Sequence, residues 1–152
     1  MRCRPAAAGG NVTHPGAGPG PILSIDPGRE KCGLAVVRQD GCVLHRAIVA
    51  AAQIAPTVAD LAVRFDVSAV VIGNGTAAHD VTRGLAAVHL PVTPVLVDER
   101  HSSEQGRRRY FQENPPRGWR RLLPVSLQTP PRPYDDYVAV VLAERYLALG
   151  RQ

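Results

Sequence analysis

The chain has little lysine, few cysteines and no long apolar run. Its 18 basic residues include a single lysine, Lys31. The three cysteines, Cys3, Cys32 and Cys42, lack CxxC-type spacing, which argues against a structural zinc site and against a disulfide framework. No segment approaches the ~20 apolar residues of a membrane span, and the N-terminal stretch lacks the apolar centre of a signal peptide. We therefore expect a cytoplasmic protein without membrane contact.

The length of 152 residues fits one domain with one hydrophobic core. Residues 1–20 contain small residues, proline and glycine but no apolar run, so burial cannot offset the cost of ordering them. The sequence predicts a disordered tail over 1–20, followed by a single domain over 21–150.

Positive charge is concentrated in one part of the chain. Residues 100–132 hold eight arginines against two glutamates, whereas acids outnumber bases in the rest of the predicted domain. Such a patch is expected of a protein that contacts phosphates, although a solvated arginine-rich face explains it about equally well. Trp119 and Tyr110 could stack on unpaired bases, but single aromatics near a loop more often pack locally. The candidate nucleic-acid contacts in the patch are Arg100, Arg107, Arg108, Arg109, Arg120 and Arg121.

Hydrophobic periodicity predicts a mixed α/β fold. Three short strands with tight turns, which imply an antiparallel meander, are expected at 21–26, 33–37 and 42–49. The pattern then alternates between helix and strand, as parallel βαβ units require, with helices near 58–65 and 81–88 and strands at 69–73 and 93–98. We therefore expect a five-stranded mixed sheet flanked by helices.

The last third of the chain predicts two helices joined by a long loop. Ser102 or Ser103 is expected to cap a helix that runs to about Glu113. The proline-rich segment 114–133 predicts a long loop, and Asp135 or Asp136 is expected to cap a final helix to about residue 149.

Acidic residues stand where strands end. Asp26 closes the first strand, and Glu99 follows the last strand directly after Asp98. The carboxyl ends of strands in open α/β sheets border the functional crevice, so both acids are placed for a site. Asp135 and Asp136 begin the final helix, where an acid either caps the helix or faces a ligand.

If the final helix starts beside those strand ends, the carboxylates share a small volume and need a cation to remain ionised together. Oxygen ligands favour Mg²⁺ or Mn²⁺ over Zn²⁺, and two ions about 4 Å apart would suit cleavage of a phosphodiester bond. The alternative is that these acids form only turns and helix caps, and the residue pattern leaves both interpretations open.

Four motifs follow one another along the chain: LSIDPGREKCGLAV at 23–36, VVIGNGT at 70–76, VDERHSS at 97–103 and DDYVAVVLAERYL at 135–147. In sequence and in order they resemble the YqgF/RuvX family of Holliday junction resolvases and pre-16S rRNA-processing nucleases. The central motif is shorter than the form common in the family.

The resemblance implies an RNase H-like fold in which Asp26, Glu99 and an acid of the final helix bind two catalytic metal ions. The YqgF pattern places that acid on Asp135, whereas a RuvC-type resolvase would place one on Asp136, so both are kept as candidates. The resemblance also places Ser103 near the site. We single out no residues for an organic cofactor.

Several functions remain open. The first is a nuclease on structured RNA with a role in pre-16S rRNA processing and ribosome biogenesis, which we favour. The second is a Holliday junction resolvase, which would act on branched DNA as a homodimer rather than a monomer. The third is a nucleic-acid-binding module without catalytic activity. A sugar-kinase or actin-like ATPase would need a second such domain, for which this chain has no room.

Overall fold

The computed structural model describes residues 20–150, so the predicted tail, apart from Gly20, lies outside the described residues. Each predicted helix and strand is present, with ends that differ by a few residues. In chain order they are β1 (Ile22–Asp26), β2 (Lys31–Val37), β3 (Val43–Ala50), α1 (Ile54–Arg64), β4 (Ala69–Gly73), α2 (Ala78–Ala86), β5 (Val95–Val97), α3 (Ser102–Glu113) and α4 (Asp135–Leu149). Short 3-10 helices follow β3 (η1, Ala51–Gln53) and interrupt the long loop (η2, Gly118–Leu122; η3, Val125–Leu127).

The five strands form one mixed sheet in the order β3-β2-β1-β4-β5. The meander β1-β2-β3 is antiparallel, whereas β4 pairs with β1, and β5 with β4, in parallel. This arrangement confirms the predicted sheet. The central strand β1 ends at Asp26, which lies opposite Gly33 of β2.

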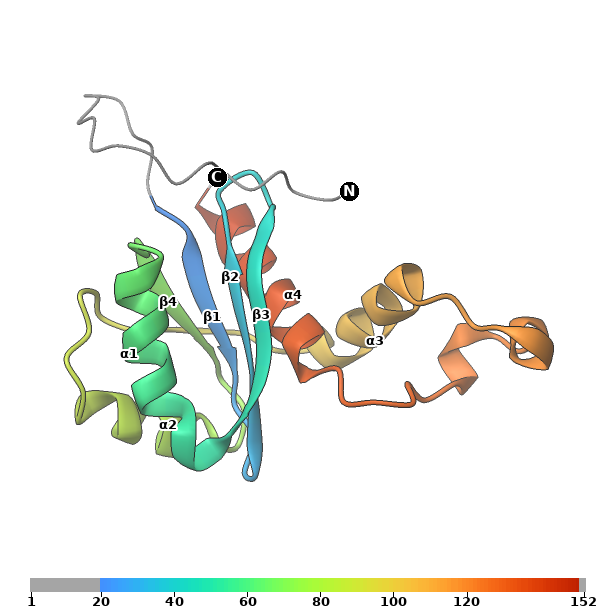
Figure 1. Ribbon diagram of the computed structural model, residues 1–152, viewed down its shortest axis with the longest axis horizontal. Coiled ribbons are helices and arrows are strands. Elements are labelled where there is room, and N and C mark those ends of the chain that lie inside the picture. Colours follow the sequence, from blue (N-terminus) through green and yellow to red (C-terminus); the bar gives the residue numbers. More distant parts are fainter. Residues whose placement is uncertain (1–19, 151–152) are drawn as a thin grey trace.

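Helices cover both faces of the sheet (Figure 1). One core lies between the sheet and α1 with α2, around Leu23, Val58 and Leu85. The other lies between the sheet and α4, around Ala35, Val71 and Val140. On its far side α4 packs against α3. A helix covered on both sides should be apolar almost all round, and seven consecutive residues of α4, 137–143, are buried.

A buried hydroxyl ties α4 to the central strand. Ser24 of β1 is fully buried, and its Oγ lies 2.6 Å from the carbonyl oxygen of Ala139 and 3.3 Å from that of Ala35. A buried hydroxyl without a partner would cost about 1–3 kcal/mol, so this bond favours one position of α4 along β1.

The predicted side-chain caps are wrong for both later helices. The residue before α3 is His101, which has φ 61° and no side-chain cap hydrogen bond. The N–H of Ser102 donates to the carbonyl of Glu99, so the chain enters the helix through a tight turn. The residue before α4 is Tyr134, also without a side-chain cap, and this places Asp135 and Asp136 in the first helical turn.

The expectation about cysteines needs one correction. Cys32 is a free, buried thiol, but Cys42 is disulfide-bonded, whereas Cys3 lies outside the described residues. No helix in the described part of the chain is long and apolar enough to cross a membrane.

The start of α4 approaches the sheet at a glycine. A Cβ at Gly33 would overlap the backbone carbonyl of Asp135 and would lie 2.8 Å from the backbone nitrogen of Asp136. Backbone atoms cannot move aside as a side-chain tip can. Only glycine therefore allows this close contact between β2 and α4.

We predict that Gly33→Ala lowers the free energy of unfolding by about 1–3 kcal/mol, because the added methyl group overpacks a rigid contact. Gly84→Ala is the matched control, since a Cβ there meets only the Cβ of Ala55 at 3.9 Å. It should raise the stability of α2 by about 0.5–1 kcal/mol. Urea unfolding followed by circular dichroism measures both, and equal stability of the two variants would contradict the prediction.

Candidate active site

Asp26 and Asp135 come together where the central strand ends. Asp26 is half-buried at the end of β1, and Gly33, its partner in β2, allows the first turn of α4 to lie against the sheet. The carboxylate of Asp135 also lies 3.8 Å from the Nζ of Lys31, the first residue of β2. Two acids separated by more than one hundred residues in the sequence therefore share one end of the sheet.

Glu99 reaches the same end of the sheet from the segment after β5. The side-chain oxygen of Asn74 accepts a hydrogen bond from the Glu99 N–H at 3.2 Å. The Glu99 carboxylate lies over the glycines of the β4–α2 loop. A Cβ at Gly73 would lie 2.6 Å from its Oε2, and a Cβ at Gly75 would overlap its Oε1. The absence of two side chains thus makes room for one carboxylate.

Arg145 of α4 fixes the backbone on both sides of Glu99. Its guanidinium donates to the carbonyl oxygens of Asp98 at 2.8 Å and Arg100 at 2.5 Å. The Arg100 N–H in turn donates to the carboxylate of Asp98 at 3.1 Å. Arg145 is therefore a positioning residue that motif spacing did not identify. The sequence feature that could have indicated it is a basic residue within an otherwise apolar helix.

The electrostatics of Asp26 reflect this crowding. Burial is the largest cause that raises the pKa of Asp26, and together with the negative charges of Asp135 and Glu99 it moves this pKa from 3.8 to about 7. Both effects favour the neutral acid over the carboxylate. An acid with so strongly raised a pKa, beside a cavity at the end of a strand, is typical of a functional site.

Asp136 belongs to a different cluster from Asp135. Its carboxylate lies 3.1 Å from the Nε of Arg46, whose guanidinium also stacks 3.8 Å from the ring centre of Tyr137 and pairs with Glu113 at 3.3 Å. The Asp136 side chain is only 16% exposed, compared with 33% for Asp135. Among the sequence candidates, the structure thus groups Asp26, Glu99 and Asp135, and it pairs Asp136 with β3.

The three carboxylates fit a divalent cation by their chemistry. Their oxygens are hard ligands of the kind that Mg²⁺ and Mn²⁺ prefer. A cation would also offset the negative charges of Asp135 and Glu99, which add to burial in raising the pKa of Asp26. Within residues 20–150, however, no three His, Cys, Asp or Glu side chains are grouped closely enough to hold a metal ion as they lie. The carboxylates would have to converge on the ion.

A cavity of about 410 Å³ opens beside Asp26. Its walls include Ser103 from the start of α3 and Val138 from α4. Lys31 and Arg132, which motif spacing did not single out, supply positive charge at its walls. The end of the long loop, residues 129–134, completes it. Ser103 therefore lines the same cavity as Asp26.

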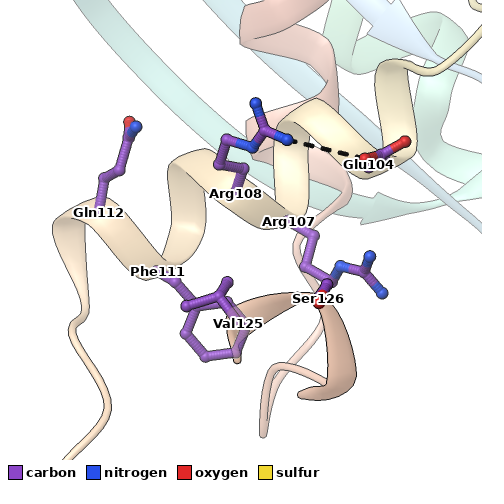
Figure 2. Close-up of a pocket in the computed structure, with 7 residues that line it drawn as sticks. All are labelled: Glu104, Arg107, Arg108, Phe111, Gln112, Val125 and Ser126. Carbon is purple, nitrogen blue, oxygen red and sulfur yellow. Dashed lines mark ion pairs between the residues drawn. The ribbon is translucent and has the colours of Figure 1, made fainter. Parts of the chain in front are cut away.

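The predicted basic contacts are divided between several environments. Arg109 is ion-paired with Glu144 of α4 and lies 3.8 Å from Glu113, so it joins helices rather than facing solvent freely. Arg107 and Arg108 line a second cavity, of about 320 Å³, between α3 and η3, where Arg108 pairs with Glu104 at 3.7 Å (Figure 2). Arg120 and Arg121 lie on η2, in the part of the loop that extends away from the sheet.

The pKa of Asp26 generates a prediction for the metal-free protein. Because the folded protein binds this proton more tightly than the unfolded chain does, the stabilisation is complete below about pH 4 and is lost as the pH rises through about 7. Wild type in EDTA should therefore lose more stability between pH 5 and pH 8 than Asp26→Asn, which cannot ionise. Urea unfolding at both pH values measures this, and identical losses for the two proteins would refute it.

The comparisons with known proteins agree with this architecture. Residues 20–110 match the family model described as Tex protein YqgF-like domain. The match spans more than half of the chain and includes Asp26 and Glu99, but it ends before α4. No curated protein matches the chain.

Two solved structures of RuvC from Thermus thermophilus have a similar fold. One, "T. thermophilus RuvC in complex with Holliday junction substrate", has a TM-score of 0.55 at 21% identity. The other, "Thermus thermophilus RuvC structure", has a TM-score of 0.56 at 17% identity. Both alignments cover 86% of this chain and 95% of the other chain. The likeness confirms the RNase H-like fold class, and with the family match it leads to one conclusion: the chain belongs to the family of YqgF-like domains of the Tex type.

Proposed function

We propose that this protein is a divalent-metal-dependent nuclease that hydrolyses phosphodiester bonds, with structured RNA as its preferred substrate. The observation that carries the proposal is that Asp26, Asp135 and Glu99 lie at one end of the sheet. Burial and the two neighbouring charges raise the pKa of Asp26 there to about 7. Three separate parts of the chain bring these acids to one end of the sheet. Carboxylates this close repel one another when they are ionised, and a bound cation would offset that repulsion.

Asp26, Glu99 and Asp135 are the proposed ligands for two Mg²⁺ or Mn²⁺ ions. When bound, such ions make a water more acidic and stabilise the charge that develops on a phosphodiester. The cavity beside Asp26 offers room for the scissile bond, and Lys31 and Arg132 at its walls offer charges that orient a phosphate. Asp136 holds Arg46 and so positions the start of α4.

The basic residues of the region after β5 are the proposed contacts for the rest of the nucleic acid. Arg100, Arg107, Arg108, Arg120 and Arg121 would bind phosphates, and Ser103 would donate to a phosphate at the cavity. Arg109 is held by Glu144, which favours a positioning role for it.

The RNA preference rests on the YqgF/RuvX resemblance, which implies pre-16S rRNA processing in the cytoplasm. The alternative substrate is a four-way DNA junction, because the similar fold of RuvC was solved with a Holliday junction substrate. That alternative requires a homodimer with two sites, whereas RNA cleavage can be performed by a monomer.

A binding module without catalysis is the second candidate. It is favoured by one observation: within the described residues, no three potential ligands are grouped closely enough for a metal ion. In that case the acids would have only a structural role, and the basic region would bind nucleic acid without cleaving it.

The deciding experiment measures cleavage by variants of Asp26 and of the two neighbouring acids of α4, Asp135 and Asp136. We predict that Asp135→Asn and Asp26→Asn each reduce cleavage by at least about a hundredfold, because each removes a charge from the proposed metal site. Asp136→Asn, the matched control, should retain most activity since its partner is Arg46. Labelled single-stranded RNA, a precursor rRNA end and a four-way DNA junction serve as substrates, each with Mn²⁺, Mg²⁺ or EDTA.

Cleavage that needs a divalent ion and prefers the precursor end would support RNA processing, and preference for the junction would select resolution. Loss of activity in Asp136→Asn but not in Asp135→Asn would overturn the ligand assignment. Clean wild-type protein that binds but cleaves none of the substrates would favour the binding module.

The glycines beneath Glu99 provide an independent test. We predict that Gly75→Ala leaves stability within about 0.5 kcal/mol of wild type, because the overlapping atom is the mobile end of a side chain. Cleavage should fall by roughly a hundredfold, since the carboxylate is displaced from its position. Gly84→Ala controls for the change from glycine to alanine, and full activity of Gly75→Ala would remove Glu99 from the proposed site.

A further inference from the structure

Residues 114–133 form an arm that extends from the end of α3, away from the sheet, and returns to α4 (Figure 1). The arm contains η2 and η3. Phe111 of α3 and Val125 of η3 both line the second cavity (Figure 2). Its returning end, residues 129–133, lines the cavity beside Asp26. The arm and the proposed active site are therefore continuous.

Positive charge on the arm is uncompensated. Between Glu113 and Asp135 there is no acidic residue, but there are four arginines, Arg117, Arg120, Arg121 and Arg132. Among the ion pairs of the described residues, none involves Arg117, Arg120 or Arg121. This differs from Arg46 and Arg109, which are paired with acids of the fold. Free guanidinium groups on a protruding segment suit a polyanion.

An aromatic ring lies among these arginines. Trp119 is 72% exposed, so it does not pack locally, whereas Tyr110 is buried against Phe111 and Tyr137. The turn that carries Trp119 is held by Gln128, whose side-chain amide donates to the carbonyls of Arg120 at 2.8 Å and Leu123 at 2.9 Å. The indole is therefore presented to solvent by an ordered turn.

We propose that the arm is a binding site for unpaired nucleic acid, in which Trp119 stacks on a base while Arg117, Arg120 and Arg121 contact the flanking phosphates. A phosphate backbone matches the free positive charge, and a base face matches the exposed indole. In a duplex, neighbouring bases cover each base face, so an aromatic platform selects unpaired segments. The proposal rests on the proposed function, for which it specifies a substrate with an unpaired stretch beside the cleaved bond.

Trp119 is the chain's only tryptophan, so its fluorescence reports on the arm alone. The full chain carrying Asp26→Asn is titrated in EDTA with a single-stranded RNA and with a blunt duplex of the same sequence. Stacking predicts strong quenching by the single strand and little by the duplex. Labelled-RNA anisotropy should show about tenfold weaker single-strand binding for Trp119→Ala, with recovery in Trp119→Phe.

Leu122→Ala is the matched control, because Leu122 is 87% exposed on the same turn but has no aromatic face. It should bind as wild type does. Replacing Arg117, Arg120 and Arg121 with glutamine should reduce the salt dependence of binding, since each phosphate contact adds to the slope.

Three results would overturn the proposal: single-strand binding without quenching, equal effects of Trp119→Ala on single strand and duplex, or self-association that Trp119→Ala abolishes. The last would make the arm a contact between two copies of the chain. Because binding is measured without metal in Asp26→Asn, quenching without cleavage by wild type would refute only the nuclease. Cleavage without quenching would refute only the arm.

Discussion

The contact between the first turn of α4 and β2 at Gly33 is the constraint on which the rest of the site depends. Because Gly33 has no side chain, the backbone of Asp135 lies directly against the strand that pairs with Asp26. The hydroxyl of Ser24 bonds to Ala139 one turn further along the helix and favours the same placement. A helix from the end of the chain thereby delivers a carboxylate to the first strand.

Glu99 joins the site by a different means. Its carboxylate occupies space left by Gly73 and Gly75, and its backbone is held by Asn74 and Arg145. Packing of α4 therefore controls two acids, Asp135 through its first turn and Glu99 through the guanidinium near its end. Burial of Asp26, and then the negative charges of Asp135 and Glu99, raise the pKa of Asp26, so keeping this group ionised at neutral pH costs stability.

The arginines divide into structural and available groups, which net charge alone cannot distinguish. Arg46, Arg109 and Arg145 each join two elements through ion pairs or backbone carbonyls. Arg117, Arg120 and Arg121 of the arm form no ion pair among the described residues, and the arm ends at the cavity beside Asp26. The unpaired positive charge therefore lies on the arm, along which a long polyanion could bind and reach the cavity beside Asp26.

The order of helices and strands could be predicted from the sequence, because hydrophobic periodicity is a local property, and the same pattern placed Asp26 and Glu99 at strand ends. The sequence could not choose between Asp135 and Asp136, because neighbouring side chains on a helix point about 100° apart and only packing sets the rotation. It also missed Arg145 and the glycine contacts, and it placed side-chain caps where the structure has none. These features depend on contacts between segments that are distant in the sequence, and the packing of α4 against the sheet sets those contacts.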